Sequence, residues 1–188
     1  THWIRELPGS LLQNNISHGI ARISEYIRGE QPEVIAQGFT STFLKDLGED
    51  EVIDELRVMI RDGRSSTAYF TFSSRMRPTL RAFRVYGERN ALFLDHDQQT
   101  LIGVRGDRFK SYLEKFIPPY LYAKQYLSNA HVNMKYFLKN DFHMKSGMKK
   151  LIESFYRSIR ENQPAPIPYR EIILTSRIMD DIFRQIKY

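Results

Sequence analysis

Residues 54–74, DELRVMIRDGRSSTAYFTFSS, contain two segments in which large apolar residues occur at every second position. This period of two is typical of strands with one buried face. The dipeptide Asp62-Gly63 lies between the two segments, and Asp-Gly at such a place is a strong signal for a hairpin turn. We therefore predict two neighbouring antiparallel strands, 54–62 and 66–74.

The same alternation continues on both sides of this hairpin. It predicts six strands in all, and the short connections between them favour antiparallel pairing, because parallel pairs need long crossovers. Helical periodicity flanks the strands at both ends of the chain. We expect an α+β fold, with an open, largely antiparallel six-stranded sheet and helices packed on one face, formed by residues 1–188 as one domain. The expected strands are 33–39, 54–62, 66–74, 80–87, 91–95 and 100–105.

Before the strands, apolar residues recur with helical spacing from Leu12 to Ile27, after a Ser10 that is a suitable N-cap and before Gly29. After the strands we predict a helix broken at Pro118-Pro119, then helices over 120–139, 147–163 and, beyond a proline-rich linker, up to residue 186. The apolar residues that predict the first helix are Leu12, Ile16, Ile20, Ile23 and Ile27.

The composition excludes several classes of protein. The 188 residues include no cysteine, which excludes disulfide scaffolds, thiolate zinc sites and thiol catalysis, and gives no reason to expect an oxidising compartment. We therefore expect a cytoplasmic protein, and no apolar run is long enough to span a membrane. No histidine pair has metal-binding spacing, and His96, between two aspartates, fits a turn better than a metal ligand because further ligands are missing. We expect no metal site.

The net charge of +6 raises the question of polyanion binding. The densest basic stretch carries Arg75, Arg77, Arg81 and Arg84, which fit either a solvated surface or contacts to phosphate. A non-catalytic binding or scaffold module, with a basic face for an anionic polymer or nucleic acid, is therefore the alternative function that the sequence leaves open.

His18 is the histidine with the most suggestive neighbours. It lies off the apolar stripe of the first predicted helix, and Asn14 and Arg22 are four residues away on either side, on the same helix face. An imidazole flanked by an amide and a guanidinium could bind a hydroxylated or anionic substrate and move a proton. Spacing alone favours a surface or half-buried structural histidine over a catalytic one.

Residues 8–18, PGSLLQNNISH, resemble the G-G-x-L-x-D-x-G-x-H segment of the glucose–fructose oxidoreductase/inositol dehydrogenase (Gfo/Idh/MocA) family. Residues 83–95, FRVYGERNALFLD, are similar to a strand-turn-strand segment of that family's C-terminal domain. The order of elements, a motif helix, an open sheet and closing helices, is also similar over nearly all of the chain.

The resemblance implies that the chain is the substrate-binding and dimerisation domain of an NAD(P)-dependent oxidoreductase acting on a sugar, sugar derivative or polyol. It implies a catalytic role for His18, beside the reacting hydroxyl, and substrate binding by Asn14 and Arg22. Asn14 stands where the family has an acid and can hydrogen-bond a hydroxyl, but it cannot act as a base. Ser10 replaces the second glycine of the motif.

The family's N-terminal Rossmann domain, with its glycine-rich loop and lysine, has no counterpart in these residues. The resemblance therefore implies a domain excised from a longer enzyme, which alone is inactive and binds no cofactor, because NAD or NADP is bound mainly by the missing domain. Its expected partners are a sugar-like substrate, that Rossmann domain and a second copy docked on the open sheet face, but neither a membrane nor nucleic acid.

Overall fold

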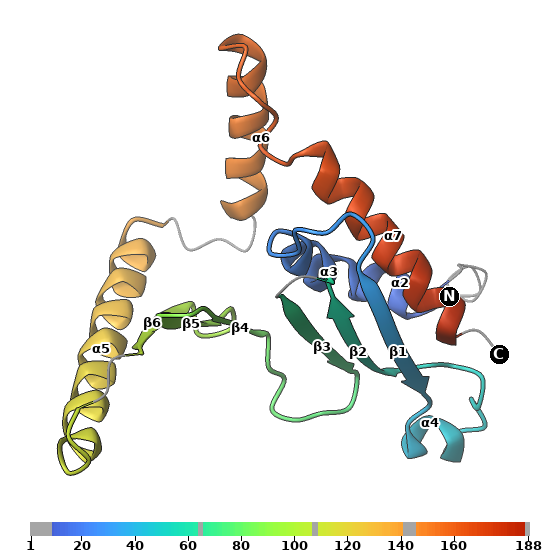
Figure 1. Ribbon diagram of the computed structural model, residues 1–188, viewed down its shortest axis with the longest axis horizontal. Helices are drawn as coiled ribbons and strands as arrows, with labels where there is room; N and C mark the ends of the chain where they lie inside the picture. Colours follow the sequence, from blue (N-terminus) through green and yellow to red (C-terminus); the bar gives the residue numbers. More distant parts are fainter. Residues whose placement is uncertain (1–8, 64–65, 107–108, 141–145, 187–188) are drawn as a thin grey trace. The chain divides into compact units, whose positions relative to one another are not determined.

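The computed structural model describes residues 9–63, 66–106, 109–140 and 146–186 (Figure 1). Helices and antiparallel strands are grouped along the chain, which confirms the α+β class. The helices are α2 (Leu12–Asn15), α3 (Ser17–Ser24), α4 (Thr42–Asp46), the 3-10 helix η1 (Leu113–Lys115), α5 (Ile117–Leu138), α6 (Ser146–Arg160) and α7 (Tyr169–Ile186). The strands are β1 (Glu33–Phe39), β2 (Glu55–Arg61), β3 (Thr67–Ser73), β4 (Ala82–Tyr86), β5 (Asn90–Asp95) and β6 (Thr100–Arg105).

All six predicted strands are present, but they form two antiparallel three-stranded sheets, β1-β2-β3 and β4-β5-β6, rather than one six-stranded sheet. Each sheet is a meander of strands joined by short turns. The segment between β3 and β4 spans residues 74–81 and is longer than a hairpin turn. Alternation of apolar and polar residues predicts where a strand lies but not which strand pairs with it. The division of the six strands into two sheets was therefore not predicted.

The chain divides into two compact units. The first comprises Thr1–Met76 with Arg157–Tyr188, and the second comprises Arg77–Tyr156. Two compact units can still belong to one domain, so the expected single domain over 1–188 stays a prediction.

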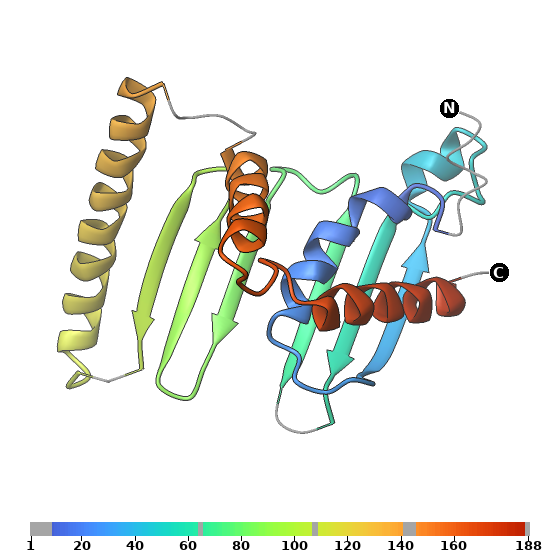
Figure 2. The same cartoon turned by 90° about the horizontal axis from the view of Figure 1, so that it is seen from above.

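In the first unit, helices α3 and α7 cover one face of the β1-β2-β3 sheet (Figure 2). The side chains of β2 that face the helices are almost completely buried, whereas the opposite face of β2 is partly open. Together with the apolar stripes of the two helices they form the core, whose most buried large residues are Leu12, Ile16, Ile20, Ile27, Leu56, Ile60, Ile178 and Ile182.

The first predicted helix is interrupted at Ile16, which separates α2 from α3. The apolar stripe is nevertheless continuous and buried, because the Ile16 N–H bonds to Leu12 and its carbonyl accepts from Ile20, at 3.1 and 3.0 Å. The expected N-cap at Ser10 is wrong. Ser10 adopts a positive φ of 45° within a turn, and Leu11 precedes the helix without a side-chain cap.

In the second unit, the long helix α5 lies along the free edge of β6 rather than over a face of the sheet (Figure 2). Gln125 accepts a hydrogen bond from the Gly103 N–H at 2.8 Å and donates to the Gly103 carbonyl at 3.0 Å. Asn129 repeats this pairing at Leu101, with both distances 3.0 Å. Side-chain amides thus satisfy the outward backbone groups of an edge strand.

A similar device closes the edge of β1 in the first unit. Gln185 of α7 accepts from the Ala36 N–H at 2.9 Å and donates to the Val34 carbonyl at 2.9 Å. Among the described residues, β1 is the first strand and β6 the last, and each is hydrogen-bonded along its outer edge by side-chain amides of a helix.

The helix expected before Pro118-Pro119 is only the short η1. The two prolines do not end a helix but lie in the first turn of α5, where the missing N–H groups need no intrahelical acceptor. No helix in the described part of the chain is long and apolar enough to cross a membrane.

Candidate functional site

His18 and Asn14 lie at the interruption between α2 and α3. Both residues are exposed, as their place off the apolar stripe predicts. The His18 imidazole and the Asn14 side-chain amide form no hydrogen bond or ion pair with any described residue, whereas the Asn14 carbonyl accepts from the Ser17 hydroxyl at 3.1 Å. Both side chains are therefore available to a ligand.

Two glycines fix this segment against its surroundings. A Cβ on Gly9 would lie 2.3 Å from the ring of Phe183 on α7, and a Cβ on Gly19 would lie 2.3 Å from the ring of Phe70 on β3. Both distances are far below van der Waals contact, so only glycine permits such close packing. The aromatic rings thus hold the segment that carries His18 between α7 and the sheet.

Arg22 differs from the other two predicted site residues. It is half-buried, and its guanidinium Nε lies 3.8 Å from a carboxylate oxygen of Glu25, one helical turn further on. An ion pair of this length at the surface contributes little to stability and can exchange for a ligand anion. Asn14, His18 and Arg22 follow one another at intervals of four residues, and the helical hydrogen bonds across Ile16 keep them in successive turns.

This group can recognise polar ligands through complementary hydrogen bonds. A neutral imidazole has one donor and one acceptor, an amide has both, and a guanidinium has donors only. A ligand with adjacent hydroxyls, or a hydroxyl next to an anionic group, could be held by all three.

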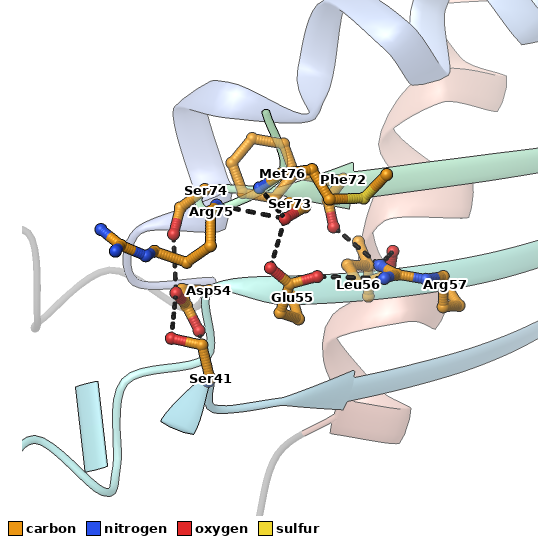
Figure 3. A network of polar contacts seen from close by, with 10 residues as sticks. All are labelled: Ser41, Asp54, Glu55, Leu56, Arg57, Phe72, Ser73, Ser74, Arg75 and Met76. Carbon is orange, nitrogen blue, oxygen red and sulfur yellow. Dashed lines mark hydrogen bonds and ion pairs between the residues drawn. The ribbon is translucent and has the colours of Figure 1, made fainter. Parts of the chain in front are cut away.

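The most extensive polar network was missed by sequence reasoning and lies at the start of β2 (Figure 3). Asp54 is completely buried. One of its oxygens accepts from the Ser41 N–H at 2.7 Å, and the other accepts from the hydroxyls of Ser41 and Ser74 at 2.8 and 2.6 Å. The backbone N–H of Ser74 donates to the Asp54 carbonyl at 3.1 Å. The network therefore links the end of β1 to β2 and β3.

The hydrogen bonds keep Asp54 ionised. Burial by itself raises the pKa of Asp54, but hydrogen bonds from the Ser74 hydroxyl, from the N–H and hydroxyl of Ser41 and from its own backbone outweigh burial and lower the pKa below its ordinary value. Asp54 is therefore a weaker base than an ordinary aspartate, and its hydrogen bonds join the segment after β1 to β2 and β3.

Glu55, the next residue, anchors the opposite face of the sheet. It accepts a short hydrogen bond from the Ser73 hydroxyl and pairs with the Arg57 guanidinium at 3.0 Å. Arg57 also donates to the carbonyls of Leu56 and Phe72 at 2.8 and 2.9 Å. The hairpin register, in which Glu55 faces Ser73, was the signal that could have revealed both networks, because it places Asp54 opposite Ser74.

Arginines of the basic stretch already contact other side chains. Arg81 donates from its backbone N–H and from Nε to Asp97, at 3.1 and 2.8 Å. The hydrogen bonds from Arg81 hold the pKa of Asp97 below its usual range, and Asp97 in turn raises the pKa of Arg81. The guanidinium of Arg84 lies over the ring of Phe93 at 5.0 Å, and that of Arg75 over Phe43 at 3.7 Å. Arg75 belongs to the first unit and the others to the second.

The described residues contain no cluster of three histidine or carboxylate side chains that could hold a metal ion. All strand pairs between residues 33 and 105 are antiparallel, and none is followed by a glycine-rich loop that opens a helix. The pyrophosphate of a dinucleotide is normally bound by such a unit, so the described residues do not fit NAD(P).

Comparisons with known proteins leave the family open: no family model, no curated protein and no solved structure matches this chain.

Proposed function

We propose that this chain is the substrate-binding and dimerisation domain of a cytoplasmic NAD(P)-dependent oxidoreductase that acts on a hydroxyl of a sugar, sugar derivative or polyol. The observation that carries the proposal is the pair of exposed, unengaged side chains of His18 and Asn14 on a segment clamped at Gly9 and Gly19. A segment fixed by rigid packing with polar side chains left free is typical of a binding site.

In this proposal His18 is the group that contacts the reacting hydroxyl. Its imidazole would accept the hydroxyl proton as the hydride leaves the carbon, or orient the hydroxyl for another base. Asn14 would hydrogen-bond a neighbouring hydroxyl, and Arg22 would contact an anionic substituent in place of Glu25. The hydride acceptor NAD(P) would be bound by a separate Rossmann domain, since the described residues do not fit it.

The open face of the β1-β2-β3 sheet supports the dimerisation part of the proposal. Ile35, Met59 and Tyr69 are in register across this face, and the two outer residues are 45% and 76% exposed. Phe39, four residues further along β1 and on the same face, is also 45% exposed. A second copy docked here would remove these apolar side chains from water.

Ligand binding to the 188-residue chain tests the site directly. The imidazole resonances of His18 are followed by NMR during titration with neutral sugars, polyols and sugar phosphates. We expect the His18 resonances to shift with at least one of these ligands, and His18→Ala and Asn14→Ala to weaken the binding. The exposed His131 on α5 supplies the control variant His131→Ala, which should bind normally.

Failure of every ligand class to shift His18 would remove the substrate site from the proposal. The alternative function, a basic module for anionic polymers, makes the opposite prediction. It requires retention on heparin that persists at moderate salt, with no dependence on His18.

A further inference from the structure

Helix α5 carries a second polarity pattern that the β6 contact does not use. None of its 22 residues is buried, and the amides that bond to β6 lie at intervals of four residues on one face. On another face, residues separated alternately by three and four positions are apolar and exposed. This set, the α5 seam, consists of Tyr120, Ala123, Leu127, Ala130, Met134 and Phe137.

The large members of the α5 seam are unusually open for apolar side chains. Tyr120 is 71% exposed, Leu127 69%, Met134 58% and Phe137 66%. Spacing of three and four residues is the heptad pattern of helices that pack side by side. The α5 seam therefore has both the pattern and the exposure of a helix-pairing surface.

We propose that the α5 seam pairs with the α5 seam of a second copy of this chain, with the two helices antiparallel. The seam is self-complementary about a point midway between residues 128 and 129. In that register Ala123 faces Met134 of the other copy and Leu127 faces Ala130, so each small residue meets a large one. Tyr120 meets Phe137, which allows aromatic packing at both ends.

Parallel pairing of the same seam would be much poorer. It would place Ala123 against Ala123 and Ala130 against Ala130, while Leu127 and Met134 would each meet their own copies. The layers of two alanines would leave gaps, and the layers of two large side chains would be crowded. Both gaps and crowding are unfavourable in a packed interface.

Charge is compatible with the pairing but does not drive it. Helix α5 contains Lys124, Lys135 and no carboxylate, and both lysines lie beside the seam rather than within it. Association should therefore persist or strengthen as salt screens the lysines. If each of the eight large side chains in the pair buries about 100 Å², the interface buries about 800 Å², which is typical of weak, reversible complexes.

This inference does not depend on the proposed function, because the α5 seam shares no residue with the open face of β1-β2-β3. The exposed apolar stripe of α6, which includes Ile152 and Phe155, is the other candidate occupant. The self-complementarity of the α5 seam favours a second α5.

Cross-linking tests the pairing and its direction, because the chain has no cysteine of its own. Full-length chains carrying Ala123→Cys and Met134→Cys, with tags of different size, are mixed and treated with a short bis-maleimide. We expect cross-links between the two different chains, and few between identical chains. A third chain carrying Ile152→Cys tests α6 as the occupant. The proposal would be overturned if most products joined identical chains, if cross-links formed only to the Ile152→Cys chain, or if no products formed.

Sedimentation analysis of the full chain measures the strength of the pairing. Leu127→Lys should weaken self-association at least about tenfold, or 1.4 kcal/mol. The matched control Val132→Lys changes another exposed apolar residue of α5, outside the seam, and should have little effect. Both variants are also made with Tyr69→Lys, which removes association through the open sheet face. Equal effects of the two α5 variants would refute the role of the seam.

Discussion

Removal of the Asp54 carboxylate should destabilise the first unit more than any other single change in its polar network. In Asp54→Ala, the Ser41 N–H and the hydroxyls of Ser41 and Ser74 would lose their acceptor inside the protein. The Asp54 side chain is fully buried, so water can replace it only after local rearrangement.

The magnitude follows from the three lost hydrogen bonds. A buried N–H without an acceptor costs about 1–3 kcal/mol, and each hydroxyl, which can rotate towards other partners, costs about 0.5–1 kcal/mol. We expect Asp54→Ala to lower the free energy of unfolding by about 3 kcal/mol. Asp54→Asn keeps the shape and one acceptor oxygen and should lower it by about 1 kcal/mol.

Urea unfolding followed by circular dichroism measures these differences, and hydrogen exchange of the β2 amides shows that the first unit is the part affected. The exposed Asp180 supplies the control Asp180→Asn, which should change stability by less than about 0.5 kcal/mol. If Asp54→Ala were no less stable than Asp54→Asn, or if neither differed from the control, the structural role of the network would be refuted.

The effect should also depend on pH. Because the folded-state pKa of Asp54 is lowered, its ionised form stabilises the protein above the unfolded-state pKa of 3.8, and this contribution is lost as pH falls through the folded-state value. The stability difference between the wild type and Asp54→Asn should therefore be greatest near neutral pH and decrease below about pH 4. A difference that stays constant as the pH is lowered well below 4 would contradict the assignment.

Two other substitutions test the packing of the motif segment and the edge of the second sheet. Gly19→Ala should lower the melting temperature, because the new methyl would overlap the Phe70 ring at a cost of about 1–3 kcal/mol, more than the roughly 1 kcal/mol that alanine gains in a helix. Asn129→Leu should accelerate exchange of the Leu101 amide about fivefold, which corresponds to the loss of about 1 kcal/mol of edge hydrogen bonding.

Both substitutions, Gly19→Ala and Asn129→Leu, have a control within the same protein. Phe70→Leu removes part of the ring, so Gly19→Ala should be less harmful in that background, and an unchanged penalty would show that the clash is not the cause. Ser128→Leu introduces the same side chain next to Asn129 on α5 and should leave Leu101 exchange as it is. Equal acceleration by both changes would refute the edge-pairing role of Asn129.

The strands were predictable because alternation is a local property of the sequence. Asp62-Gly63 correctly predicted the β2–β3 hairpin, and Gly63 adopts the positive φ of 74° that such a turn favours. The division into two sheets was not predictable, because no residue of β3 or β4 specifies which strand it pairs with. The break at Ile16 was also hidden, since the apolar stripe continues through it.

Some features of the candidate site were likewise predictable from local sequence, and others were not. The position of His18 and Asn14 off the buried stripe follows from helical spacing and agrees with their exposure, whereas their role in catalysis or binding stays a prediction. The contacts of Gly9 with Phe183 and of Gly19 with Phe70 join residues far apart in the sequence, so no local pattern could reveal them. The same holds for Gln185, which bonds to β1 from the other end of the chain.

The amides that bond to β1 and β6 also limit how copies of this chain can assemble. Strand addition needs a row of free N–H and C=O groups, and at Val34, Ala36, Leu101 and Gly103 these groups are already occupied by Gln185, Asn129 and Gln125. An incoming strand would have to displace a helix before it gained a hydrogen bond. Growth into sheet-like polymers by addition of a strand to β1 or β6 is therefore opposed.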